Sequence, residues 1–320
     1  MQVLVGPNLM QIESAFPDLG KKYPQIEFVY CAEQAALADT IAGATVYVGG
    51  LARDTFLRAR NLKWIQSPSS GIDRYLTIPE LVQSDVLLTS ARGTHGVCLA
   101  ESVLGMILAF TRGIRDSIFL QQQHTWAHHE IRSQLVELTG STLGIIGFGA
   151  VGRALARRAQ AFDMRIVAVD LYPADRPDYV GELWGLDRLD DLLRESDYVV
   201  VTVPRTRQTH AMIGAAQLAL IKPSAMLIGI SRGGIIDQAA LAQALREKRL
   251  AAAALDVCEP EPLPADDELW DLENCLITPH AAGGTQFERQ YILDIFYENL
   301  NRFLRGDLPL RNQIDKQRGF

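Results

Sequence analysis

The segment that most constrains the fold is "TLGIIGFGAVGRALARRAQAF" (142–162), where an apolar run meets three glycines and then an amphipathic stretch. Gly147, Gly149 and Gly152 follow the pattern G-x-G-x-x-G. The first glycine permits a tight turn, and the third lets a helix pack closely against the preceding strand. The second leaves the N–H groups at the start of the helix open to a phosphate. The segment therefore predicts a strand–turn–helix unit in a parallel α/β sheet.

An acidic residue follows this unit at the position that a dinucleotide site requires. Asp170 comes directly after the next apolar run, 165–169, about 20 residues beyond the glycines, where a carboxylate binds the ribose hydroxyls. We expect NAD as the cofactor, because an acid at this place repels the 2′-phosphate of NADP. NADP remains possible if Arg176, Arg205 and Arg207 converge on that ribose.

Short apolar runs separated by longer amphipathic stretches occur on both sides of the glycine segment. The predicted strands before it are 2–5, 26–30, 44–48, 62–66 and 85–89, and those after it include 197–203, 225–230, 252–257 and 275–278. A long helix is expected at 96–116; it is apolar on most sides and therefore buried. A final helix is expected at 288–306. This alternation predicts two α/β units of unequal size.

Composition excludes several classes of protein. The net charge of −7 argues against a nucleic-acid surface, which needs a basic face. No apolar run approaches the roughly 20 residues of a membrane span, and "MQVLVG" (1–6) predicts a first strand and not a signal peptide. The cysteines are far apart, which favours reduced thiols in the cytoplasm over disulfides or a zinc site. They are Cys31, Cys98, Cys258 and Cys275.

Three charged or titratable residues stand at the ends of late strands. Arg232 follows "AMLIGIS", Glu261 lies in "LDVCEPEPLP", and His280 lies in "ITPHAAGGT". Ligands of open α/β sheets bind outside the carboxyl ends of the strands, so these side chains are expected to converge. Each has a structural alternative: a surface arginine, a solvated glutamate or a hydrogen-bonded histidine. Together they provide a carboxylate binder, a proton donor and an anion that stabilises the protonated donor, as reduction of a 2-oxo acid requires.

A histidine pair provides a weaker signal. His124 and His128 have the i, i+4 spacing that can bind a metal on a helix. Because no third ligand is evident, we expect no metal and interpret the segment as solvated or as a subunit contact.

The stretches "GFGAVG", "SRGGIID", "LDVCEPEPLP" and "TPHAAGGT", with "LKWIQSPSSGIDRYL" upstream, resemble the D-isomer-specific 2-hydroxyacid dehydrogenase family, which includes glyoxylate/hydroxypyruvate reductases. The resemblance covers essentially the whole chain in the same order. It implies that Arg232 binds the substrate carboxylate and carbonyl, that His280 is the acid/base and that Glu261 pairs with it. It also implies substrate contacts from Ser69, Ser70 and Gly71.

The resemblance implies an α/β fold with two Rossmann-like or flavodoxin-like, doubly wound parallel-sheet domains and an active-site cleft between them. Residues 1–97 plus 287–320 would form the substrate domain, and 98–286 the NAD-binding domain. The expected cofactor contacts are Gly147, Gly149, Ala150, Val151, Gly152, Asp170, Pro204, Thr209, Ser231, Asp256 and His280.

The implied function is an oxidoreductase that reduces a small 2-oxo acid to a D-2-hydroxy acid by hydride transfer from NAD(P)H, acting as a cytoplasmic homodimer without nucleic-acid or membrane partners. The alternatives are NADPH-dependent glyoxylate/hydroxypyruvate reduction and a dinucleotide-sensing, corepressor-like interaction protein. The sequence does not identify the 2-oxo acid. We expect no appended regulatory domain, and this expectation argues against a phosphoglycerate dehydrogenase under serine feedback.

The chain departs from the family pattern at two positions. Gly229 stands where the family has asparagine, and Arg205 stands where it has leucine. We expect neither to touch the chemistry directly, although Arg205 could alter contacts with the cofactor or the substrate.

Overall fold

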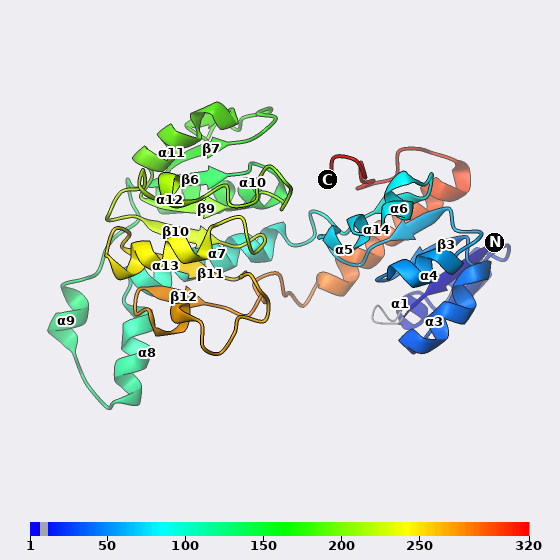
Figure 1. The fold of residues 1–320 in the computed structure, drawn as a ribbon, viewed down its shortest axis with the longest axis horizontal. Coiled ribbons are helices and arrows are strands. Elements are labelled where there is room, and N and C mark those ends of the chain that lie inside the picture. The colour runs from blue at the N-terminus through cyan, green and yellow to red at the C-terminus, as the bar shows by residue number, and fades with distance from the viewer. Residues whose placement is uncertain (7–11, 320) are drawn as a thin grey trace. The chain divides into compact units, whose positions relative to one another are not determined.

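The computed structural model describes residues 1–6 and 12–319, which form two compact units. Unit 1 contains Met1–Thr94 and Thr285–Phe320, and unit 2 contains His95–Gly284 (Figure 1). The divisions fall a few residues before those expected from the sequence. Each unit has a single, entirely parallel sheet, as the α/β prediction requires.

Unit 1 contains a five-stranded sheet with the order β2-β1-β3-β4-β5. Its strands are β1 (Gln2–Val5), β2 (Glu27–Tyr30), β3 (Val46–Val48), β4 (Trp64–Gln66) and β5 (Leu87–Thr89), so all five predicted strands are confirmed. Its helices are α1 (Ile12–Ala15), α2 (Leu19–Lys22), α3 (Gln34–Thr40), α4 (Arg53–Arg58), α5 (Asp73–Leu76), α6 (Pro79–Gln83) and α14 (Glu288–Arg305), with a 3-10 turn at Ile41–Gly43.

Unit 2 contains a seven-stranded sheet with the order β12-β11-β10-β9-β6-β7-β8. Its strands are β6 (Thr142–Ile146), β7 (Arg165–Val169), β8 (Glu182–Trp184), β9 (Tyr198–Val201), β10 (Met226–Gly229), β11 (Ala252–Leu255) and β12 (Cys275–Ile277). Its helices are α7 (Gly96–Thr111), α8 (Ile114–Gln122), α9 (His128–Arg132), α10 (Ala150–Ala159), α11 (Leu189–Glu195), α12 (Ala215–Leu218) and α13 (Gln238–Arg246). Short 3-10 turns lie at Gln160–Phe162, Leu186–Arg188 and Glu268–Asp271.

Both sheets are buried on their two faces, which explains the continuous apolar runs in their strands. In β9, Val200 packs in one core cluster with residues of α7 and α10, whereas Val199 and Val201 pack in the other with residues of α11 and α13. In unit 1, Phe296 of α14 packs with Trp64 of β4 on one face of the sheet, whereas Ile65 of the same strand belongs to a second cluster with residues of α5 and α6. Both sheets are therefore doubly wound, as predicted.

The prediction of one helix over 96–116 is wrong. The helix α7 ends at Thr111, Gly113 adopts a left-handed conformation with φ 61°, and α8 starts at Ile114. The two helices meet at a bend of 64°. In the described part of the chain no single helix is long and apolar enough to cross a membrane, although this bent pair passes the same test when taken together.

The histidine pair does not share a helix. His124 has φ 54° and lies in the segment between α8 and α9, whereas His128 is the first residue of α9. The i, i+4 spacing on one helix face, on which the metal alternative depended, is therefore absent. Within residues 1–6 and 12–319 no group of three or more potential metal ligands occurs.

Candidate active site

The glycine turn joins β6 to α10 at the middle of the larger sheet. Gly147 has φ 98°, a conformation that favours glycine. A Cβ atom on Gly152 would overlap the Gly147 carbonyl oxygen, so this position is restricted to glycine by packing. A Cβ atom on Gly149 would meet no other atom within 4 Å. This opening lies at the start of α10, whose first turn contains Ala150 and Val151, and it suits a bound phosphate.

Asp170 stabilises this turn from the end of β7. Its Oδ2 accepts a hydrogen bond from the Phe148 N–H at 2.6 Å, and its Oδ1 accepts one from the Tyr172 N–H at 2.9 Å. The carboxylate therefore lies beside the glycine turn, where the sequence predicts contact with a ribose. Arg153, which the sequence analysis did not identify, lies over the Phe148 ring at 4.8 Å. The residues around the glycine turn therefore fit a dinucleotide.

Two of the three arginines that could hold a 2′-phosphate have partners within the protein. Arg176 Nη1 donates to the carbonyl oxygens of Val180 and Gly181 at 2.7 and 2.6 Å. Arg205 forms an ion pair with Glu259. Both guanidinium groups are therefore engaged by other groups of the protein.

Three further predicted cofactor residues, Pro204, Thr209 and Ser231, lie on loops after β9 and β10. The Thr209 hydroxyl donates to the Pro204 carbonyl oxygen at 2.7 Å and accepts from the Thr206 N–H at 2.8 Å, so it closes the turn after β9. Ser231 Oγ is buried and has no hydrogen-bond partner in the described part of the chain. A buried hydroxyl of this kind is expected to find a partner, such as a bound ligand or a water molecule.

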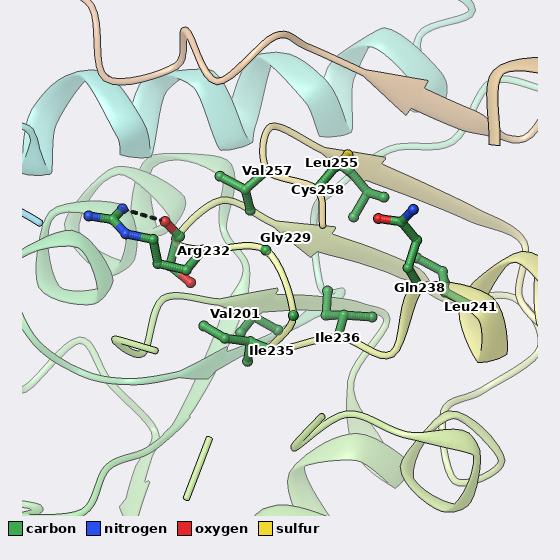
Figure 2. A pocket seen from close by; sticks show the side chains of 13 residues that line it. Val201, Gly229, Arg232, Ile235, Ile236, Gln238, Leu241, Leu255, Val257 and Cys258 are labelled. Atoms are coloured by element: carbon green, nitrogen blue, oxygen red, sulfur yellow. Dashed lines mark hydrogen bonds between the residues drawn. The ribbon is translucent and has the colours of Figure 1, made fainter. Parts of the chain in front are cut away.

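Arg232 directly follows Ser231 after β10. Its Nη1 donates to the Ser231 carbonyl oxygen at 2.7 Å. Figure 2 shows its side chain pointing away from Ile236 and Leu241, which line a small pocket beneath the same loop. The guanidinium is therefore presented outside the apolar core.

Gly229, at the end of β10, has a packing explanation. A Cβ atom there would lie 3.0 Å from Ile236 Cδ1 and 3.0 Å from Leu255 Cδ2. These apolar side chains occupy the space that an asparagine side chain would need. Local packing therefore explains why glycine occupies position 229 in this chain.

His280 and Glu261 are in direct contact. His280 Nδ1 lies 2.7 Å from Glu261 Oε2, and the other carboxylate oxygen, Oε1, accepts a hydrogen bond from the Cys258 N–H at 3.0 Å. An ionised carboxylate only accepts hydrogen bonds, so the histidine nitrogen is the donor and Nε2 is left for other chemistry. The two side chains are 47% and 36% exposed, which keeps them within reach of a ligand. The structure therefore brings together two of the three predicted catalytic residues.

Asp256, which the resemblance gives as a cofactor contact, has a structural role that the sequence did not reveal, and its contact with a cofactor stays a prediction. It is 2% exposed, and its carboxylate accepts hydrogen bonds from Thr278 Oγ1 at 2.6 Å and from the N–H groups of Ala281 and Ala282. Its carbonyl oxygen accepts from the His280 N–H at 2.9 Å. His280 has φ 52°, an unusual value for a residue with a side chain, and these bonds hold it there. The available signal was an acidic residue at the end of the apolar run "AAALDV".

The predicted substrate loop lies in unit 1, after β4. The Ser69 N–H donates to the Ser67 hydroxyl at 3.1 Å, and the Gly71 N–H donates to the Ser69 hydroxyl at 3.2 Å. The Ser70 hydroxyl donates to the Ala91 carbonyl oxygen at 3.0 Å. These bonds hold the loop against the end of β5. Its contact with substrate stays a prediction.

Comparison with known proteins adds an independent finding. Residues 104–282 match the family model of the D-isomer specific 2-hydroxyacid dehydrogenase, NAD binding domain. The chain is 36% identical over 260 residues to a glyoxylate reductase of Korarchaeum cryptofilum, an alignment that covers 80% of this chain and 77% of that protein. It is 34% identical over 259 residues to a D-3-phosphoglycerate dehydrogenase of Methanocaldococcus jannaschii, covering 80% of this chain but only 48% of that protein.

The fold has close counterparts among solved structures. An NADPH-dependent glyoxylate/hydroxypyruvate reductase from Sinorhizobium meliloti, in complex with NADP and sulfate, superposes with a TM-score of 0.84 at 27% identity. The match covers 100% of this chain and 99% of that chain. The similarity therefore extends over both units, whereas the chain spans about half the length of the Methanocaldococcus protein.

Proposed function

We propose a function for this chain from its family, since it belongs to the D-isomer specific 2-hydroxyacid dehydrogenases. The proposed reaction is the reduction of a small 2-oxo acid to the corresponding D-2-hydroxy acid with NAD(P)H. Two of the relatives described above, from Korarchaeum and Sinorhizobium, carry the name of a reductase of this kind. The alternative of a dinucleotide-sensing interaction protein is not favoured by these matches.

The observation that carries this proposal is the contact between His280 and Glu261. The two residues lie on the loops that follow β12 and β11 in the parallel sheet of unit 2, which also carries the glycine turn. Reduction of a carbonyl group requires a proton for the oxygen atom. His280 would donate that proton from Nε2, because Nδ1 is engaged by Glu261. The contact with Glu261 fixes the orientation of the ring.

Arg232 would bind the substrate carboxylate. Its planar guanidinium can form two parallel hydrogen bonds to a carboxylate, and its charge polarises the adjacent ketone. A substrate bearing a carboxylate next to a carbonyl group is therefore the expected class.

The cofactor would lie along the glycine turn, with Asp170 beside the adenosine ribose. When bound, it supplies two electrons as a hydride. We propose that NADH is preferred, because the carboxylate of Asp170 disfavours a 2′-phosphate while Arg176 and Arg205 have partners elsewhere.

A panel of 2-oxo acids, assayed with NADH and with NADPH by the loss of absorbance of the reduced nicotinamide, would test the proposal. We expect turnover with glyoxylate, hydroxypyruvate or a larger 2-oxo acid, and loss of turnover in His280→Asn. A chain that binds NADH but reduces no member of the panel would contradict the proposal. Higher activity with NADPH would contradict only the cofactor preference.

We also propose that the protein is a cytoplasmic homodimer. Unit 2 exposes the apolar side chains of Ile118, Phe119 and Trp126, which are 55%, 61% and 93% exposed, on and beside α8. A surface of this kind favours contact with another chain. Light scattering coupled to size exclusion is expected to give twice the mass of 35.4 kDa. A monomer at micromolar concentration would contradict the proposal.

A further inference from the structure

Arg205, the residue that departs from the family pattern after β9, contacts the loop that carries Glu261. Arg205 Nη2 lies 2.5 Å from Glu259 Oε1. Arg205 follows β9 and Glu259 follows β11, and β10 lies between these two strands in the sheet. The ion pair therefore spans the end of an intervening strand.

The glycines after β10 make room for this contact. Gly234 has φ 75°, and a Cβ atom on it would overlap the Glu259 carboxylate and lie 3.2 Å from Arg205 Cζ. A Cβ atom on Gly233 would overlap the Cys258 carbonyl oxygen. The loops after β9, β10 and β11 therefore meet at one point.

A short series of contacts links this point to the acid/base pair. The Glu259 N–H donates to Gln238 Oε1 at 3.2 Å, so its backbone is held as well as its side chain. The preceding residue, Cys258, donates its N–H to Glu261 Oε1 at 3.0 Å. The other oxygen of Glu261 lies 2.7 Å from His280 Nδ1. A displacement of Glu259 is therefore expected to displace Cys258 and, with it, the Glu261 carboxylate that contacts His280.

We propose that Arg205 and Glu259 form a clasp that fixes the loop after β11 and thereby holds the Glu261 carboxylate at the His280 ring. Both are positioning residues, since neither contacts His280 in the structure. Arg205 also neutralises Glu259, which is the second anion of the "EPE" segment 259–261. The inference rests on the proposed function, in which Glu261 and His280 act as a pair.

Variants of Arg205 and Glu259 are expected to fold, because both side chains are partly exposed. The Arg205 and Glu259 side chains are 37% and 40% exposed, and exposed ion pairs contribute little to the free energy of unfolding. Arg165 and Glu195 form a comparable pair at 2.8 Å, with side chains 46% and 29% exposed, at the start of β7. Arg165→Leu is therefore a matched control.

The experiment compares Arg205→Leu, Glu259→Gln, the corresponding double variant and the charge exchange R205E/E259R. We expect each single variant to lower kcat about fivefold, with the KM for NADH within about twofold of the wild-type value. The double variant should be no slower than the slower single variant, because both changes break one interaction. The charge exchange should restore part of the loss, and Arg165→Leu should have no effect.

A second readout does not depend on turnover. In protein labelled with ¹⁵N-histidine, the His280 Nδ1–H proton reports its hydrogen bond to Glu261, and its resonance can be assigned from its loss in His280→Asn. We expect this resonance to shift or broaden in Arg205→Leu and Glu259→Gln and to stay in place in Arg165→Leu.

Two results would overturn the clasp. One is an unchanged kcat and an unchanged resonance in both single variants. The other is a raised KM for NADH in Arg205→Leu alone, which would make Arg205 a cofactor ligand. A wild-type protein that reduces no 2-oxo acid would instead refute the proposed function, and the resonance would still decide whether the clasp positions Glu261.

Discussion

Replacing Glu261 by glutamine removes a negative charge from beside the His280 ring while keeping a hydrogen-bond acceptor of nearly the same shape. The two side chains are 2.7 Å apart and 47% and 36% exposed, so their attraction is closer to the value in water than to that in a dry interior. A charge-assisted hydrogen bond contributes about 1.5–3 kcal/mol and a neutral one about 0.5–1.5. With the solvent exposure taken into account, the variant should lose about 1 kcal/mol of the interaction that holds the His280 ring.

This loss has a defined sign in the kinetics. His280 must be held in place to give its proton to the carbonyl oxygen, so a loss of about 1 kcal/mol should slow reduction about fivefold. The effect should fall on kcat/KM for reduction and leave the Kd for NADH within about twofold of the wild-type value.

The assay measures kcat/KM for reduction and for the reverse oxidation in wild type, Glu261→Gln and the control Glu195→Gln. Oxidation uses the same ring as a base, so it should be slowed in Glu261→Gln as well. Glu195 pairs with Arg165, and its variant should keep the wild-type rates. Identical rates in all three proteins would refute a role for Glu261 at the His280 ring.

Arg232→Ala should lower kcat/KM at least about a hundredfold, because about two charge-assisted hydrogen bonds to the substrate carboxylate are lost. The Kd for NADH, measured by fluorescence titration, should stay within about threefold, and a near-normal kcat/KM would remove Arg232 from the site. Wild type should prefer NADH to NADPH at least about tenfold in kcat/KM, and Asp170→Ala should reduce that ratio. A preference for NADPH in the wild type would contradict the role of Asp170. Burial raises the pKa of Cys258 to about 11 and that of Cys275 to about 12, so both should remain protonated and resist iodoacetamide at pH 8 in the folded protein. Rapid alkylation of either thiol, mapped by mass spectrometry, would show that the burial is incorrect.

Local sequence patterns determined most of the fold. The buried strands are runs of apolar residues because both faces of each parallel sheet are covered, so β1, β6 and β9 could be located without knowledge of their neighbours. The glycine turn could also be located, because its requirements are local: a positive φ at Gly147 and close packing at Gly152. The edge strand β8 was missed, because its three residues, Glu182–Trp184, are only half-buried or exposed and form no apolar run.

The break between α7 and α8 depended on tertiary packing. The sequence analysis predicted one helix over 96–116, although Gly113 lies in the largely polar stretch TRGIRD (111–116) at the place of the break. In the structure, a Cβ atom on Gly113 would lie 2.9 Å from Ile131 Cγ2, which belongs to α9. The close approach of a later segment, together with the left-handed φ of Gly113, coincides with the turn. The contact of Gly113 with a segment later in the chain cannot be predicted from the periodicity of residues 96–116.

The sequence by itself identified Arg232, Glu261 and His280 as candidates, because charged or titratable residues at the ends of buried strands are costly unless they are used. Only the tertiary structure revealed the contacts between residues on different loops. Asp256 holds the backbone of His280, and Arg205 reaches Glu259 across β10. These contacts depend on the order of the strands in the sheet, which brings together loops that are distant in the chain. The spacing of residues along one strand or helix carries no record of that order.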